Sequence, residues 1–108
     1  MITTHVLDTA IGGPAVGLAA VLEIHKASEW VRIASAHTDD RGRIASWTEG
    51  LTIGPGVYRL TFDTGTYHRD VRSFFPEVQV IFKVRAEGEH VHVPLLLSPF
   101  GYSTYRGV

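Results

Sequence analysis

Short runs of alternating apolar and polar residues recur along most of the 108-residue chain and constrain its fold more than any other feature. Successive side chains of a β-strand point to opposite faces, so this period of two is typical of strands that bury one face. Strands are expected at 3–10, 17–26, 30–37, 43–46, 57–63, 78–84, 89–97 and 102–108. Seven or eight short strands at nearly regular spacing, with no repeat or linker, predict an all-β antiparallel β-sandwich.

The segment 17–26 also has the length and residue types of a helix. Gly12, Gly13 and Gly17 crowd its start and no N-cap residue precedes it, which favours a strand. The segment 64–73 has no β pattern and can hold one short helix, which would depend on packing for its stability. His68 in that segment is interpreted as a surface residue.

Composition points to one domain over residues 1–108, since a chain of this size buries a single core. Ten Lys and Arg against eleven Asp and Glu leave no basic footprint for nucleic acid or an anionic membrane. The absence of cysteine excludes disulfides, zinc–thiolate sites and a cysteine nucleophile. No signal peptide and no spanning segment of about 20 apolar residues are recognisable, so a soluble cytoplasmic protein is expected.

One strand near the end of the chain has an unusual outer face. Alternation sends Val91, Val93, Leu95 and Leu97 to the core side, and His90, His92, Pro94 and Leu96 to the other side. Two histidines beside proline and leucine are too apolar for free solvent and too polar for a core. A ligand, a partner subunit or both are therefore expected to cover this face.

Three separated motifs carry a family resemblance. They are THVLD at 4–8, DDRGR at 39–43 and HVHVPLLLSPFGYSTYRG at 90–107. Together, and in this order, they make the chain resemble the transthyretin-like 5-hydroxyisourate hydrolases over nearly its whole length. The family ends in Tyr-Arg-Gly-Ser, whereas this chain has Val108 in place of the serine, so that hydroxyl is absent.

The resemblance implies a transthyretin-like (prealbumin-like) sandwich with one short helix. It also implies hydrolysis of 5-hydroxyisourate to 2-oxo-4-hydroxy-4-carboxy-5-ureidoimidazoline in urate degradation. The family's catalytic histidine falls on His5, although its own stretch alone favours an ordinary half-buried histidine. The arginine of the family's Gly-Arg motif falls on Arg43, and only solubility is assigned to Arg41.

The polar residues suit activation of water, because the chain has no obvious nucleophile. A neutral imidazole takes a proton from water near neutral pH, and a guanidinium stabilises negative charge developing on a carbonyl oxygen. We therefore expect His5 and His92 to be the acid–base pair and Arg43 to polarise the attacked carbonyl. Tyr105 and Arg106 are expected to bind and enclose the flat ring. Which histidine is the base is left open.

A metal site is the alternative for the histidines, since His5, His90 and His92 together offer three nitrogen ligands. The motif contains no carboxylate and the resembled family works without metal, so no metal and no cofactor are expected. The resemblance further implies a homotetramer with sites in the channel where two dimers meet.

A noncatalytic carrier is the rival function, since transthyretin has this fold and binds a hydrophobic hormone in the corresponding channel. The two histidines, the arginine and the Tyr-Arg ending would crowd and charge such a channel. They favour the enzyme.

Overall fold

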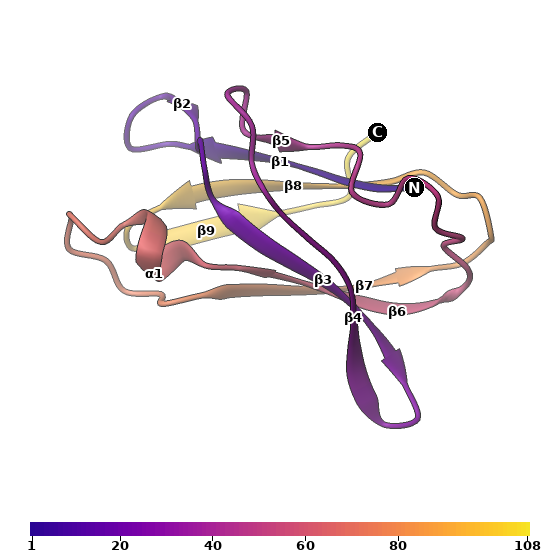
Figure 1. Ribbon diagram of the computed structural model, residues 1–108. Coiled ribbons are helices and arrows are strands. Elements are labelled where there is room, and N and C mark those ends of the chain that lie inside the picture. The colour runs from indigo at the N-terminus through magenta and orange to yellow at the C-terminus, as the bar shows by residue number, and fades with distance from the viewer.

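The computed structural model describes all 108 residues as two packed β-sheets with one short helix (Figure 1). The first sheet holds β1 (Ile2–Asp8), β2 (Gly13–Pro14), β5 (Arg43–Ile44), β8 (Val91–Ser98) and β9 (Gly101–Thr104). The second holds β3 (Ala19–Lys26), β4 (Glu29–His37), β6 (Gly56–Phe62) and β7 (Val78–Val84). The helix α1 (Thr64–Tyr67) joins β6 to β7. The predicted all-β sandwich with one short helix is confirmed.

The strand count is nine because Gly13 and Pro14, which lie between the first two expected strands, also pair with β1. Leu7 pairs with Pro14 and Asp8 with Gly13.

The helix α1 does not have the length and apolar character needed to cross a bilayer.

The centre of the first sheet is a parallel pair, β1 with β8, whereas every other strand pair is antiparallel. Alternation alone does not distinguish the two directions, so the sequence predicts the antiparallel sandwich but does not reveal this one parallel pair. The register runs from Ile2 opposite Val91 to Asp8 opposite Leu97. The first strand of the chain therefore lies against the strand with the two histidines.

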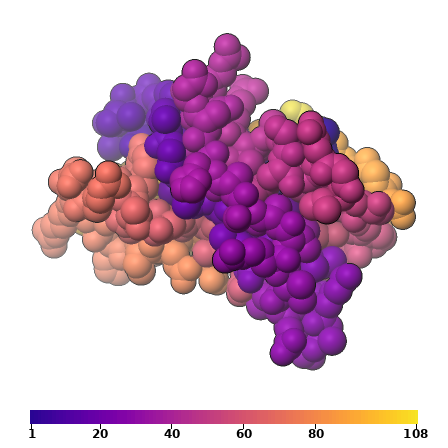
Figure 2. Space-filling view, viewed as in Figure 1, coloured from indigo at the N-terminus to yellow at the C-terminus, as the bar shows by residue number.

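The core lies between the sheets and consists of the inward faces that the alternation predicts. In β8 the buried residues include Val91, Val93, Leu95 and Leu97, and in β6 they are Tyr58, Leu60 and Phe62. Burying such side chains contributes about 1.5–3 kcal/mol each before chain entropy is subtracted. The β3–β4 hairpin extends beyond this body and protrudes in the space-filling view (Figure 2).

The last strand is shorter than expected. β9 ends at Thr104 instead of continuing from 102 to 108, and Tyr105 and Arg106 lie outside the ladder. The chain then returns to β8, where the amide of Gly107 donates to the carbonyl of His92 at 2.8 Å. The tail is therefore docked on β8.

His68 is buried, with 5% of its surface exposed, so its interpretation as a surface residue was wrong. It caps the C-terminus of α1 and packs edge-on against Tyr67. The helix is fastened to the first sheet because the Tyr67 hydroxyl donates to the buried carboxylate of Asp8 at 2.7 Å. The helix α1 has only four residues, which is too short for a periodic pattern of apolar residues. The burial of His68 could therefore not be predicted from the sequence.

Candidate active site

The turn at 39–43 is held against β1 by its own side chains and backbone. The Asp39 carboxylate accepts hydrogen bonds from the amides of Arg41 and Arg43, both at 2.9 Å. Both bonds stabilise the charged carboxylate and so lower the pKa of Asp39, and the bond from the Arg43 amide has the larger effect. Gly42 has φ +77°, and a Cβ there would collide with the Val6 carbonyl oxygen. Only glycine therefore fits this close approach.

Arg43 leaves this turn in β5 directly opposite His5 of β1. The Nε2 atom of His5 lies 2.9 Å from the carbonyl oxygen of Arg41. A carbonyl can only accept, so Nε2 carries a proton and a neutral His5 has its lone pair on Nδ1. Arg41, to which only solubility was assigned, thus orients His5 through its backbone.

His92 is half-buried on β8, and its Nδ1 lies 2.7 Å from Oγ1 of Thr3. The same hydroxyl oxygen lies 3.1 Å from Nε2 of His90. Burial first, and then electrostatic interactions with His5, His90 and Arg43, lower the pKa of His92. His92 is therefore held in its neutral form at neutral pH.

Two open cavities meet at His92. A cavity of about 840 Å³ includes Arg43, His90, His92 and Arg106 in its lining. A smaller one of about 250 Å³ includes His5, His92, Tyr105 and Gly107 in its lining. The two cavities adjoin at His92, Gly107 and Val108 and together form one crevice, which has His5, Arg43 and His92 in its lining.

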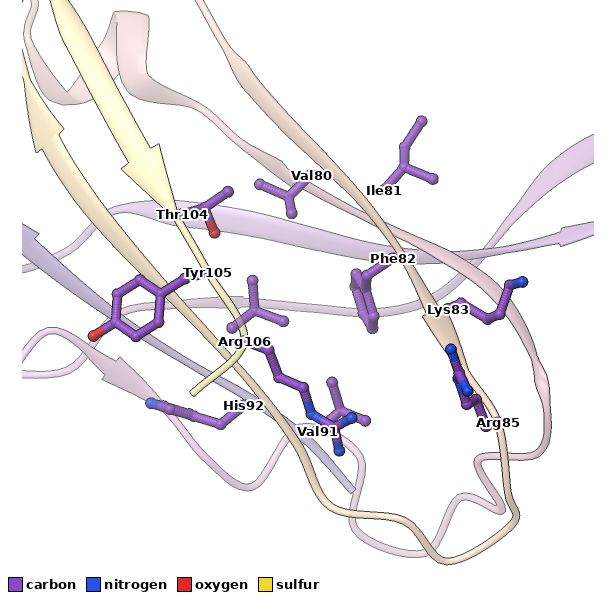
Figure 3. A pocket seen from close by; sticks show the side chains of 11 residues that line it. Val80, Ile81, Phe82, Lys83, Arg85, Val91, His92, Thr104, Tyr105 and Arg106 are labelled. Carbon is purple, nitrogen blue, oxygen red and sulfur yellow. The ribbon is translucent and has the colours of Figure 1, made fainter. Parts of the chain in front are cut away.

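Tyr105 and Arg106 border this crevice without closing it. They leave the tail in different directions, with Tyr105 on the side of His92 and Arg106 running toward Arg85 (Figure 3). Tyr105 is 58% exposed, and the Arg106 guanidinium lies 3.8 Å from the Glu89 carboxylate. Within one chain neither side chain encloses a ligand, so their substrate-binding role stays a prediction.

Sequence reasoning missed Thr3, the Arg41 carbonyl and the docking of Gly107. Thr3 precedes His5 by two residues and therefore shares its face of β1. Its contact with His92 follows from the parallel register, in which Thr3 lies opposite His92. His5, His90 and His92 do not form a cluster that could hold a metal ion. The expected independence of metal stays a prediction.

The fold and the crevice define a class, the transthyretin-type sandwich with imidazole and guanidinium groups between its first, fifth and eighth strands. A profile of the HIUase/Transthyretin family matches residues 2–107. The chain belongs to this family.

Curated relatives and solved structures are similar over nearly the full chain. The 5-hydroxyisourate hydrolase of Salmonella typhi is 46% identical over 110 residues, which cover 99% of this chain and 80% of the relative. The 5-hydroxyisourate hydrolase of Mus musculus is 44% identical over 110 residues, covering 98% and 93%.

Among solved structures, Klebsiella pneumoniae 5-hydroxyisourate hydrolase superposes with a TM-score of 0.86 at 34% identity, covering 99% of this chain and 98% of that one. Sea bream transthyretin in complex with thyroxine superposes with a TM-score of 0.92 at 33% identity, covering 99% and 94%. The backbone is therefore common to a 5-hydroxyisourate hydrolase and to a transthyretin in complex with thyroxine, and the residues of the crevice have to distinguish the two.

Proposed function

We propose that this chain hydrolyses 5-hydroxyisourate to 2-oxo-4-hydroxy-4-carboxy-5-ureidoimidazoline, a step of urate degradation. The observation that carries the proposal is the pairing of β1 with both β5 and β8, which surrounds one crevice with His5, Arg43 and His92. Relatives at 44–46% identity that are named for this activity support the choice of substrate.

In the proposed reaction one imidazole takes a proton from water as its oxygen attacks the ring carbonyl carbon. The Arg43 guanidinium stabilises the negative charge that develops on the carbonyl oxygen. The ring carbon–nitrogen bond then breaks, and the second imidazole supplies a proton to the leaving nitrogen. Positioned acid–base groups of this kind typically contribute about 10²–10⁴-fold in rate.

The test is the ultraviolet decay of freshly generated 5-hydroxyisourate. His5→Ala and His92→Ala should each lose at least about two orders of magnitude in rate, the lower end of the acid–base contribution. His25→Ala is the matched control, because His25 lies on β3 in the other sheet, beside Trp30. Rates of the two site variants within a few-fold of wild type would remove both histidines from the mechanism.

The carrier function is tested in the same experiment. If the wild-type chain leaves the spontaneous decay unchanged, the hydrolase proposal fails and a noncatalytic small-molecule carrier takes its place. The charged groups around the crevice support the enzyme, since a hydrophobic ligand would have to desolvate Arg43, His90 and Arg106.

We further propose that the chain works as a homotetramer in the cytoplasm. β7 and β9 each form an unpaired edge of their sheets, and exposed apolar side chains such as Ile81 and Tyr102 lie on them. Unpaired edges and apolar surface favour association. The His5 crevice is itself bordered by the exposed Leu7. Light scattering at micromolar concentration should give the mass of four chains, and a monomeric mass would contradict the proposal.

A further inference from the structure

The hydroxyl of Thr3 lies between two imidazoles, His92 of β8 and His90, which directly precedes that strand. Thr3 is only 8% exposed, and its Oγ1 atom is 2.7 Å from His92 Nδ1 and 3.1 Å from His90 Nε2. The parallel register places Thr3 directly opposite His92, so the contact belongs to the sheet and not to a mobile loop. Neither the motifs nor the family resemblance assigns a role to Thr3.

A hydroxyl has one proton, so it can donate to only one of the two rings. Bonds of the O–H···O type are most often near 2.7–2.8 Å, whereas N–H···O bonds are most often near 2.9–3.0 Å, so a donating hydroxyl gives the shorter contact. The 2.7 Å distance fits donation from Thr3 to His92 Nδ1, and the 3.1 Å distance fits donation from His90 Nε2 to Thr3. The direction of the chain is therefore His90 to Thr3 to His92.

This direction fixes the tautomer of His92. An Nδ1 atom that accepts a hydrogen bond holds no proton, so the proton of the neutral ring must be on Nε2. The neutral form is favoured because the ring is half-buried and shares its surroundings with four positive or titratable groups. These are His5 of β1, Arg43 of β5, His90 just before β8 and Arg106 of the tail.

We propose that Thr3 is a positioning residue that holds His92 as the Nε2–H tautomer, so that His92 presents a proton donor to the crevice. His5 has the opposite arrangement, because its Nε2 donates to the Arg41 carbonyl and its lone pair is on Nδ1. On the proposed hydrolase function, on which the catalytic meaning of this inference rests, His5 takes the proton from water. His92 then gives the proton on Nε2 to the leaving ring nitrogen while its Nδ1 takes the proton of the Thr3 hydroxyl, and Thr3 takes the Nε2 proton of His90. The exposed His90 regains a proton from solvent on Nδ1, and the proton held by His5 returns to solvent.

The tautomer can be read without any assay of activity, from ring ¹⁵N chemical shifts of the full chain labelled at histidine. Wild-type His92 should show an unprotonated Nδ1 and a protonated Nε2 at neutral pH. Thr3→Val, which keeps the shape and removes the hydroxyl, should lose this single state and mix the two tautomers. Thr3→Ser should restore it. A proton on Nδ1 of wild-type His92 would overturn the proposal whatever the variants do.

Thr4→Val is the matched control for losing a threonine hydroxyl from β1. The Thr4 hydroxyl contacts only the carbonyl of Val93, at 2.6 Å, so its loss should lower stability and leave the His92 tautomer unchanged. A change of tautomer in Thr4→Val equal to that in Thr3→Val would also overturn the proposal, since it would trace the effect to the sheet as a whole.

Measurements of kcat and KM distinguish a failure of this inference from a failure of the proposed hydrolase function. Thr3→Val should lower kcat by about tenfold or more with little change in KM, since a histidine in the wrong tautomer cannot pass its proton. Thr3→Ser should stay within about threefold of wild type. If wild type does not hydrolyse the substrate but the spectra follow the expected pattern, only the hydrolase function fails. If the tautomer shifts and kcat does not, the positioning role is refuted.

Discussion

The backbone amide of Gly107 lies 2.8 Å from the carbonyl oxygen of His92, and its α-carbon packs against the imidazole of that histidine. A Cβ added to Gly107 would lie 2.5 Å from His92 Cδ2 and 3.2 Å from Pro94 Cγ. Gly107 thus packs closely against the His92 side chain, and the tail forms part of the crevice wall.

Gly107→Ala should therefore expel the tail or displace the ring of His92, and the rate of 5-hydroxyisourate decay should fall by about tenfold or more, since misplaced acid–base groups lose most of their effect. Thermal unfolding should change little, because the tail adds one backbone bridge and no buried apolar side chain. Gly54→Ala is the control, since nothing lies within 4 Å of a Cβ there. Equal rates in the two variants would show that tail docking is unimportant.

Asp39→Ala should lower kcat/KM several-fold, because its carboxylate holds the turn that presents both the Arg41 carbonyl and Arg43 to His5. Asp39→Asn keeps the accepting oxygen and should recover most of the activity. Asp40→Ala removes the neighbouring exposed carboxylate and is the control. Activity of Asp39→Ala equal to that of Asp40→Ala would argue against a role for the turn.

The lowered pKa of His92 predicts a pH dependence of stability. At pH values above the ordinary histidine pKa near 6.5, the His92 ring is neutral in both the folded and the unfolded chain. As the pH falls through that value, the unfolded chain takes up a proton that folded His92 resists, so the free energy of unfolding decreases. The decrease ends below the folded pKa. His92→Gln should therefore lose less stability than wild type between pH 7.5 and pH 5.

Urea unfolding at one fixed protein concentration measures this difference, because association would make stability depend on concentration. His37→Gln, at an exposed position of β4, controls for the removal of one imidazole. An equal or larger acid loss in His92→Gln than in wild type would contradict the prediction.

Tyr67→Phe should destabilise the fold at neutral pH by about 1.5–3 kcal/mol, the usual cost of losing a hydrogen bond to a charged group. The variant leaves the buried carboxylate of Asp8 with only the amide of Ala10 as a donor. Urea unfolding at pH 7 tests this, and Tyr102→Phe, at an exposed position of β9, is the control. A loss no larger than that of the control would show that the hydroxyl does not fasten α1.

The same tyrosine predicts an alkaline effect. Burial first, and then Asp8, raise the pKa of Tyr67 to about 12. Between its ordinary pKa near 10 and this value the unfolded chain loses a proton that the folded chain keeps, so stability decreases as the pH rises. Wild type should lose more stability between pH 9 and pH 11 than Tyr67→Phe. A parallel decrease in both would exclude this contribution.

Alternation was enough to predict the inward faces of β6 and β8, because a period of two depends only on local backbone geometry. It carried no information on strand direction, and so the parallel pairing of β1 with β8 was missed. The burial of His68 and the early end of β9 also depend on contacts with distant residues, which no local pattern contains.

For the site, the family resemblance indicated His5, Arg43 and His92, and the structure places them around one crevice. The residues that orient them were not predictable in the same way. In the sequence Thr3 is an ordinary strand threonine, and only the β1–β8 register shows that it lies opposite His92. Arg41 acts through its backbone carbonyl, a group that every residue has, so its side chain gives no signal.

The pairing of β1 with β8 also bears on the order of events during translation. Residues 2–8 are synthesised well before their partner strand β8 and the tail at Gly107. A nascent chain therefore cannot assemble the crevice until residues 91–107 have left the ribosome, and β1 stays unpaired with β8 until then. Ribosome-bound intermediates should accordingly be inactive. The exposed edge of β1, which has not yet paired with β8, is the segment that a chaperone would bind to prevent aggregation.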